Sequence, residues 1–172
     1  TLPPTITPTQ GPSELVRATV SLPRHAALDL DTQAISAPLS AIADLKPDLS
    51  QYWKKAPTGA DFVFFAENPT VPDWQFLYPV HNTRFSIPKT PIFTRPSYED
   101  CVRMFGGLGY LIPPENTALP INGYAFESGE VGYYCIVTDT GNLGAFKLTP
   151  PGEPDGMRYV IIEYVIWDKK LP

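Results

Sequence analysis

The chain has 172 residues, of which 43% are hydrophobic, and its 13 basic and 18 acidic residues give a formal charge of -5. This length suits one domain, and the apolar content is enough for a sizeable core. An acidic surface without long runs of Lys or Arg repels a phosphate backbone, so we expect no nucleic-acid partner. No window reaches the ~18–20 apolar residues of a transmembrane helix, so we also expect no membrane insertion.

Proline is the most unusual feature of the composition. The chain contains 21 prolines, a share more than double the average of about 5%. Prolines at this density exclude long helices, and aromatic and β-branched residues fill the stretches between them. We therefore predict an all-β or β-dominated fold, an antiparallel sandwich or barrel with one short helix near 98–105.

The first twelve residues read TLPPTITPTQGP. Repeated Pro and Thr favour an extended, polyproline-like segment, which is typical of extracellular stalks, although a simple disordered terminus fits the same composition. We assign 1–13 to a Pro/Thr-rich linker or stalk and 14–172 to a single β-rich domain. The first strand is expected from Leu15, where apolar and polar residues begin to alternate with a period of two.

The front half of the domain predicts short strands around one irregular stretch. A second strand is expected at about 27–31. In the stretch 39–53, Pro47 excludes one continuous helix, so we expect a helical turn or an irregular loop there. The compact apolar runs 61–66 (DFVFFA) and 74–80 (WQFLYPV) predict two buried strands.

The middle of the chain predicts weaker strands and the helix. Brief edge strands are expected at 84–87 and 92–94, because both are flanked by prolines, which cannot donate to a ladder. Ser97 is a plausible N-cap, acidic residues follow it in the first turn, and a Gly-Gly pair comes after 98–105. These are the start and stop signals of a short helix.

The C-terminal third predicts a hairpin and then a central strand. Segments 132–139 (GYYCIVTD) and 143–148 (LGAFKL) flank a Gly-containing turn. Segment 157–167 (MRYVIIEYVIW) has β-branched and aromatic residues on both faces, as expected of a strand that is covered on both sides. We therefore expect 159–167 to lie inside a sheet, between two partner strands.

The chain has two cysteines, Cys101 and Cys135. No CxxC motif or neighbouring His suggests zinc, so the pair is either one disulfide or two buried thiols. We predict the disulfide, because the N-terminal tract is of an extracellular type. It would join the predicted helix to the first strand of the hairpin.

The run YYCIVTDTGNLGAFKL, followed by YVIIEYVIW, resembles a pattern in β-rich domains of bacterial secreted and surface proteins. In that pattern a Cys-containing strand, a T-x-x-G turn and a strand ending in Phe-x-Leu or Phe-x-Val precede a final I-x-Y strand. The runs ALDLDTQAIS, GADFVFF and LYPV are similar to the front of the same group. The resemblance covers most of the chain after Leu15 and implies a fold class and a location, not a chemistry.

Candidate catalytic and metal-binding residues are few. The two histidines, His25 and His81, are the candidates for a Ser-His or Cys-His pair, and no G-x-S-x-G motif occurs. Asp29 and Asp31 could serve as an acid and a base or bind calcium, but the local sequence offers too few further oxygen ligands, and acids at strand ends usually face solvent. We predict no catalytic residue, no cofactor and no metal.

Aromatic side chains are the remaining candidates for recognition, because rings with a polar group suit sugar stacking and protein interfaces. We predict ligand-binding roles for Tyr52, Trp53, Trp74 and Tyr78, which lie near expected loops or strand ends. Trp53 follows a proline-interrupted stretch and precedes two lysines, which favours exposure. The alternative is that Trp53 plugs one end of the core.

These observations favour a non-catalytic, extracellular or cell-surface module that binds a carbohydrate or a protein surface. Two alternatives remain open. One is a subunit of a filament or surface assembly that self-assembles through its N-terminal segment, which an ordered, buried 1–12 would favour. The other is a small secreted hydrolase that uses His25 or His81, which a histidine beside a carboxylate and a hydroxyl or thiol would favour.

Overall fold

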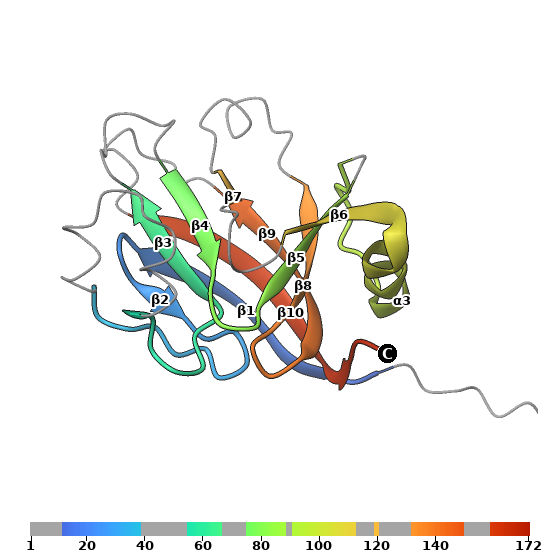
Figure 1. The fold of residues 1–172 in the computed structure, drawn as a ribbon, viewed down its shortest axis with the longest axis horizontal. Helices are drawn as coiled ribbons and strands as arrows, with labels where there is room; N and C mark the ends of the chain where they lie inside the picture. The colour runs from blue at the N-terminus through green and yellow to red at the C-terminus, as the bar shows by residue number, and fades with distance from the viewer. Residues whose placement is uncertain are drawn as a thin grey trace, which may run out of the picture.

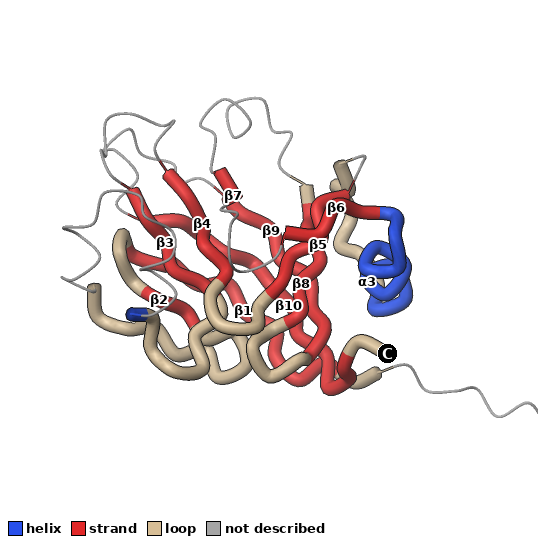
Figure 2. Tube along the Cα trace, viewed as in Figure 1, coloured by secondary structure: helices blue, strands red, loops and turns tan. Residues whose placement is uncertain are grey.

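The computed structural model describes residues 12–38, 55–66, 75–88, 91–112, 119–120, 132–149 and 159–172. These residues form two antiparallel sheets, as Figures 1 and 2 show. One sheet has six strands in the order β1-β10-β9-β8-β5-β6, and the other has four in the order β2-β3-β4-β7. The predicted β-dominated fold is confirmed, and of the two expected architectures it is an open sandwich, not a closed barrel.

Both sheets combine strands from distant parts of the chain. The six-stranded sheet contains β1 (Glu14–Pro23), β5 (Arg84–Pro88), β6 (Gly109–Ile112), β8 (Tyr133–Val137), β9 (Asn142–Thr149) and β10 (Tyr159–Lys170). The four-stranded sheet contains β2 (Ala27–Leu28), β3 (Phe62–Ala66), β4 (Gln75–Pro79) and β7 (Leu119–Pro120). The sequence patterns did not predict β6 and β7.

The first strand follows the predicted alternation. In β1, Val16 and Leu22 are buried, whereas Leu15 and Arg17 are exposed. The strand pairs antiparallel with β10 along its length. At the start of β1, the backbone N–H of Asp168 donates to the carbonyl of Ser13, which brings the two ends of the domain together.

Strand β10 lies between β1 and β9, so the predicted central position is confirmed. Alternate side chains face the core between the two sheets: Val160, Ile162, Tyr164 and Ile166. On the opposite face, Val165 and Trp167 pack in a second cluster beneath the helix. Burial on both faces explains why this segment is apolar at nearly every position.

Phenylalanine rings fill the space between the sheets. Phe62 of β3 lies 4.9 Å from Phe85 of β5 and 5.1 Å from Phe146 of β9, measured between ring centroids, and all three rings are fully buried. Tilted and edge-to-face contacts of this kind are favoured by the ring quadrupole. Since Phe62 belongs to one sheet and its partners to the other, these contacts join the two layers.

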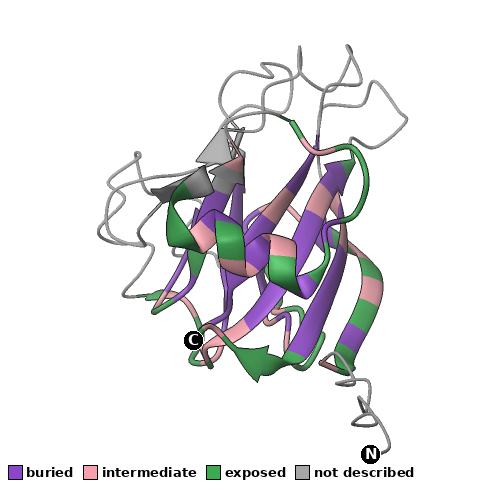
Figure 3. Cartoon of the chain, turned by 90° about the vertical axis from the view of Figure 1, so that its right-hand side faces the viewer, coloured by how far each residue is buried: buried purple, intermediate pink, exposed green. Residues whose placement is uncertain are grey.

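The predicted helix is confirmed as α3 (Tyr98–Arg103), which continues into the π-helical turn η2 (Met104–Leu108). Ser97 is its N-cap in a reciprocal capping box with Asp100, and Gly107 turns the chain out of the helix with a φ of 122°. Figure 3 shows the helix in front of the buried strands of the larger sheet. Among the described residues, no helix has the length and apolarity that crossing a membrane requires.

The disulfide and the hairpin are also confirmed. The Sγ atoms of Cys101 and Cys135 lie 1.99 Å apart, so the bond ties α3 to β8 across 34 positions of sequence. Strands β8 and β9 are antiparallel, and their turn closes when Gly141, with a φ of 91°, donates its N–H to the carbonyl of Thr138.

Two expectations about strands are wrong. The segment 84–87 is not at an edge, because β5 pairs with β8 on one side and with β6 on the other. A proline restricts only its own position in the ladder, so the residues before Pro88 remain free to pair on both sides. The segment 92–94 is a loop whose Ile92 carbonyl accepts one hydrogen bond from the N–H of Tyr133. The irregular stretch expected at 39–53 lies outside the described residues.

Candidate functional site

The four predicted ligand-binding aromatics divide into two groups. Tyr52, Trp53 and Trp74 lie outside the described residues, so their roles stay predictions. Tyr78 is described, and only 5% of it is exposed. Its ring packs 6.4 Å from the ring of Phe65 in a cluster of β2, β3 and β4, and it does not line the pocket described below. Tyr78 thus packs within the smaller sheet, away from that pocket.

Both histidines occupy turn positions with positive φ. His25 stacks on Phe65 with ring centroids 5.3 Å apart and accepts a hydrogen bond from the Arg24 guanidinium. The Nε2 atom of His81 lies 2.8 Å from the carbonyl oxygen of Pro57. The His25 ring thus packs on β3 and the His81 ring connects two loops, while the disulfide removes the only thiols of the chain from nucleophilic chemistry. A Cys-His hydrolase is thus excluded in the oxidised protein.

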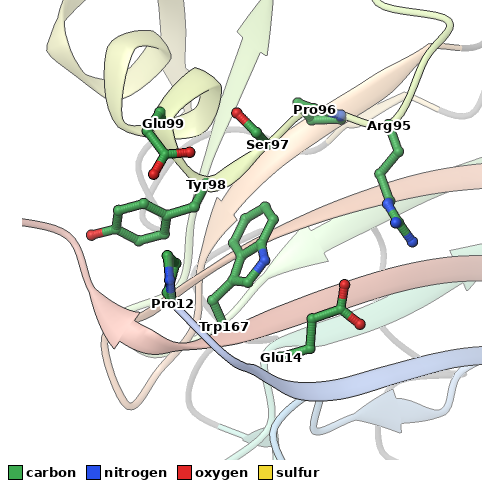
Figure 4. Close-up of a pocket in the computed structure, with 8 residues that line it drawn as sticks. All are labelled: Pro12, Glu14, Arg95, Pro96, Ser97, Tyr98, Glu99 and Trp167. Carbon is green, nitrogen blue, oxygen red and sulfur yellow. The ribbon is translucent and has the colours of Figure 1, made fainter. Parts of the chain in front are cut away.

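An open pocket lies where the start of β1, the end of β10 and the N-terminus of α3 meet (Figure 4). It has a volume of about 360 Å³, within the range of roughly 300–1,000 Å³ that is usual for small-molecule sites. Eight residues line it: Pro12, Glu14, Arg95, Pro96, Ser97, Tyr98, Glu99 and Trp167. Three of them come from the segment that leads into the helix, so the capping box also positions the pocket wall.

The floor of this pocket is aromatic. The ring of Trp167 meets the ring of Tyr98 edge to face, with centroids 5.8 Å apart and an interplanar angle of 90°. The Tyr98 hydroxyl donates to the backbone carbonyl of Lys170 at 2.9 Å, and the Lys169 ammonium lies 5.0 Å from the Tyr98 ring centroid. Burial raises the pKa of Tyr98, which keeps this phenol neutral as a donor. Both rings are therefore held in fixed orientations.

The rim of the pocket is charged and exposed. In Figure 4 the Trp167 indole lies between Arg95 and Glu14 on one side and Tyr98 and Glu99 on the other. Glu14 accepts hydrogen bonds from the Arg17 guanidinium, and this pairing lowers the pKa of the Glu14 carboxyl. At neutral pH the rim thus offers carboxylate acceptors and a guanidinium donor around an apolar floor.

The pocket was not predicted from the sequence, although local sequence patterns place two parts of its lining: the residues before the helix and Trp167. The N-cap signal at Ser97 places Arg95 and Pro96 just outside a helix, where a side chain is free to face a cavity. Trp167 ends the run 157–167, and the strand period puts it on the face of β10 away from the core between the sheets. What local patterns do not show is that β1, pairing with β10, brings Glu14 directly opposite Trp167.

A second arrangement of polar residues lies in loops at the ends of strands. One carboxylate oxygen each from Asp29, Asp31 and Asp61 lies within 4.8 Å of the others. Asp61 is fully buried, whereas the other two are half-buried. We call these three residues the carboxylate cluster.

Asp61 is the structural centre of the carboxylate cluster. Its Oδ2 accepts a hydrogen bond of 2.8 Å from the N–H of Leu30, and its Oδ1 accepts bonds of 2.8 Å from the Thr83 hydroxyl and 2.6 Å from the N–H of Asp139. Burial raises the pKa of Asp61 to about 7, against the lowering effect of these donors, and the neighbouring Asp31 raises it further. One side chain therefore joins three loops.

The half-buried members are held by separate donors. Oδ1 of Asp29 accepts from the N–H groups of Asp31 and Thr32 at 2.9 and 3.1 Å. The carboxylate of Asp31 accepts from the Thr140 hydroxyl at 2.7 Å and from the Asn142 amide at 3.0 Å. The local sequence showed only the first two acids; Asp61 joins them because its own N–H pairs with the carbonyl of Leu28, next to Asp29.

Two buried side-chain hydroxyls, those of Ser86 and Tyr164, make no hydrogen bond within the described part of the chain. Tyr164 is 1% exposed. Burial raises the pKa of Tyr164 to about 12, and the carboxylates of Asp29, Asp61 and Asp31 raise it too. The phenol therefore lies within electrostatic reach of the carboxylate cluster.

Known proteins do not add to this geometry. No protein-family model, curated protein or solved structure matches the chain significantly.

The Ser97 hydroxyl of the pocket lining donates to Asp100 at 2.8 Å and accepts from the Asp100 N–H at 3.2 Å, so it is engaged in the helix cap. The remaining polar groups are ionised side chains on an open rim. They can hold a polar ligand beside the exposed part of Trp167, which is 6% of that residue.

Proposed function

We propose that the chain is a non-catalytic extracellular module that binds a carbohydrate in the pocket at Trp167. The observation that carries the proposal is the arrangement of Arg95 and Glu14 around the indole (Figure 4). A sugar presents an apolar C–H face, which packs on an aromatic ring, and hydroxyl groups, which pair with carboxylates and guanidinium groups. This pocket offers both kinds of contact within one small volume.

The extracellular location rests on two further features. The disulfide between Cys101 and Cys135 is of a kind that persists in oxidising compartments. The Pro/Thr tract at 1–13 and the resemblance to secreted and surface domains support the same assignment. The tract would then act as a stalk that presents the domain. Residues 1–11 lie outside the described residues, so the alternative of assembly through this segment stays a prediction.

Glycan-array screening followed by calorimetric titration of the best hit tests the proposal. Arg95→Ala should weaken binding of that glycan at least tenfold, which corresponds to about 1.4 kcal/mol. Arg84→Ala is the matched control, because Arg84 is also an exposed arginine but does not line the pocket. The control should bind like the unmodified protein, and incubation should leave the glycan unchanged.

Two results would overturn the carbohydrate assignment. One is the absence of any glycan ligand together with capture of a protein partner that Arg95→Ala abolishes, which would make the pocket a protein-binding surface. The other is glycan binding that Arg95→Ala leaves unchanged, which would move the site elsewhere, Trp53 and Tyr52 then being the next candidates.

A further inference from the structure

The carboxylate cluster has the spacing of ligands around one ion. Its three oxygens lie within 4.8 Å of one another. Oxygen ligands surround Ca²⁺ at about 2.3–2.6 Å, so two ligands of the same ion are at most about 5 Å apart. Asp29, Asp31 and Asp61 therefore lie close enough together to be ligands of a single cation.

The negative charge of the cluster has no compensating cation in the described part of the chain. The ion pairs there are Arg17 with Glu14 and Arg103 with Asp100, and neither involves the cluster. The donors to the three carboxylates are all neutral: backbone N–H groups of Leu30, Asp31, Thr32 and Asp139, hydroxyls of Thr83 and Thr140, and the Asn142 amide. Neutral donors orient carboxylates but do not cancel their mutual repulsion.

The hydroxyl of Tyr164 is the independent observation that indicates a ligand. It is buried, lacks a hydrogen-bond partner in the described residues, and lies within reach of the fields of all three carboxylates. A buried hydroxyl without a partner is costly, and in native proteins such a group usually faces an ion or water. A water molecule on a cation held by the carboxylates would supply the missing partner.

Gly59 leaves space next to one carboxylate oxygen of Asp29. Oδ2 of Asp29 accepts no hydrogen bond within the described residues, and it lies 3.3 Å from where a Cβ at Gly59 would stand. Gly59 also has a φ of 85°, a conformation that side chains rarely adopt. A glycine here leaves one carboxylate oxygen accessible.

We infer that Asp29, Asp31 and Asp61 form a binding site for a divalent cation, and that Ca²⁺ is the ion that fits. The donor set consists of carboxylate oxygens without His or Cys, which selects a hard cation over zinc or copper. Because two of the carboxylates are half-buried, water can complete the coordination that calcium requires. This site is separate from the pocket at Trp167 and does not depend on the proposed function.

Thermal unfolding in EDTA and in CaCl₂ provides the first test. At a hundredfold excess over the dissociation constant, Ca²⁺ should raise the melting temperature by about 5–10 °C. Asp29→Asn keeps an oxygen that can accept from Asp31 and Thr32 but removes the charge, so it should lower the calcium affinity at least tenfold. Asp168→Asn is the matched control, since this carboxylate is exposed, pairs with Ser13 and lies outside the cluster.

Terbium luminescence provides a second test that needs no variant of the cluster. Tb³⁺ binds at calcium sites, and a tyrosine excited beside it transfers energy to the ion. Sensitised emission should appear on adding Tb³⁺, fall when Ca²⁺ displaces it, and be largely lost in Tyr164→Phe, while the Tyr98→Phe control keeps it.

A melting temperature that is equal in EDTA and CaCl₂, or an Asp29→Asn variant with unchanged calcium affinity, would overturn the site. An equal response to Mg²⁺ and Ca²⁺ would overturn the assignment to calcium. Emission that persists undiminished in Tyr164→Phe would show that the ion lies elsewhere.

Discussion

The two polar regions of this molecule use the same chemical group in opposite ways. At the pocket, the carboxyl of Glu14 is exposed and its pKa is lowered, chiefly by hydrogen bonds from Arg17. In the carboxylate cluster, the carboxyl of Asp61 is fully buried and its pKa is raised to about 7, chiefly by desolvation. The type of residue therefore does not decide what a carboxyl contributes; burial and the charge of its partners do.

The largest effect should come from removing the buried carboxyl. Asp61→Ala leaves two buried donors, on Leu30 and Thr83, and the half-buried N–H of Asp139 without an acceptor. At about 1–3 kcal/mol for each unsatisfied group, we expect a loss of about 5 kcal/mol in the free energy of unfolding. Urea denaturation measures it. If Asp61→Ala lowers the free energy of unfolding no more than Glu14→Ala does, the two carboxyls do not differ as described.

The raised pKa of Asp61 should make the stability of the fold depend on pH. Because the folded pKa of Asp61, about 7, lies above its value of 3.8 in the unfolded chain, protonation stabilises the fold fully below about pH 4. This contribution is lost as pH rises through 7. Three pKa units correspond to about 4 kcal/mol.

Melting curves in EDTA between pH 5 and 8 measure this slope. The groups near Asp61 are the carboxylates of Asp29 and Asp31 and the phenol of Tyr164. Asp61→Asn should remove most of the decline, whereas Glu14→Gln should leave it in place. The lowered pKa of Glu14 acts in the opposite direction and at lower pH. Stability that is flat from pH 5 to 8 in the unmodified protein would contradict the raised pKa.

Reduction of the disulfide should affect the pocket more than the carboxylate cluster. Breaking the bond between Cys101 and Cys135 removes a constraint over 34 positions, which the chain-entropy model values at about 3–4 kcal/mol. The helix that carries the pocket wall should loosen first. We expect a lower melting temperature and weaker glycan binding, with the calcium response retained. If the calcium response is lost and glycan binding is retained, the disulfide supports the carboxylate cluster and not the pocket, contrary to this prediction.

The smallest effect concerns the exposed pair at the pocket. Arg17→Ala should bring the pKa of Glu14 back up towards its ordinary value of 4.5, because the guanidinium hydrogen bond is the main cause of the shift. NMR titration of the Glu14 side chain measures it. Arg84→Ala serves as the control and should leave the Glu14 titration unchanged. Stability should barely change, since exposed ion pairs contribute little.

Several elements followed directly from local sequence. The alternation in β1, the Ser97 capping signal and the glycine turn before β9 each depend on residues a few positions apart. Strand period, capping and turn conformation are backbone properties of short segments, so a sequence determines them without reference to the rest of the fold.

The partners of these elements were decided only by the tertiary structure. That β5 is internal, that Tyr78 is buried, and that Asp61 completes a cluster with Asp29 and Asp31 all depend on contacts between residues far apart in the chain. Such contacts depend on which strands pair and which faces meet, and many pairings satisfy the same local pattern. Local sequence thus determined the helix and most of the strands, though not β6 and β7, whereas packing brought together the residues of both sites.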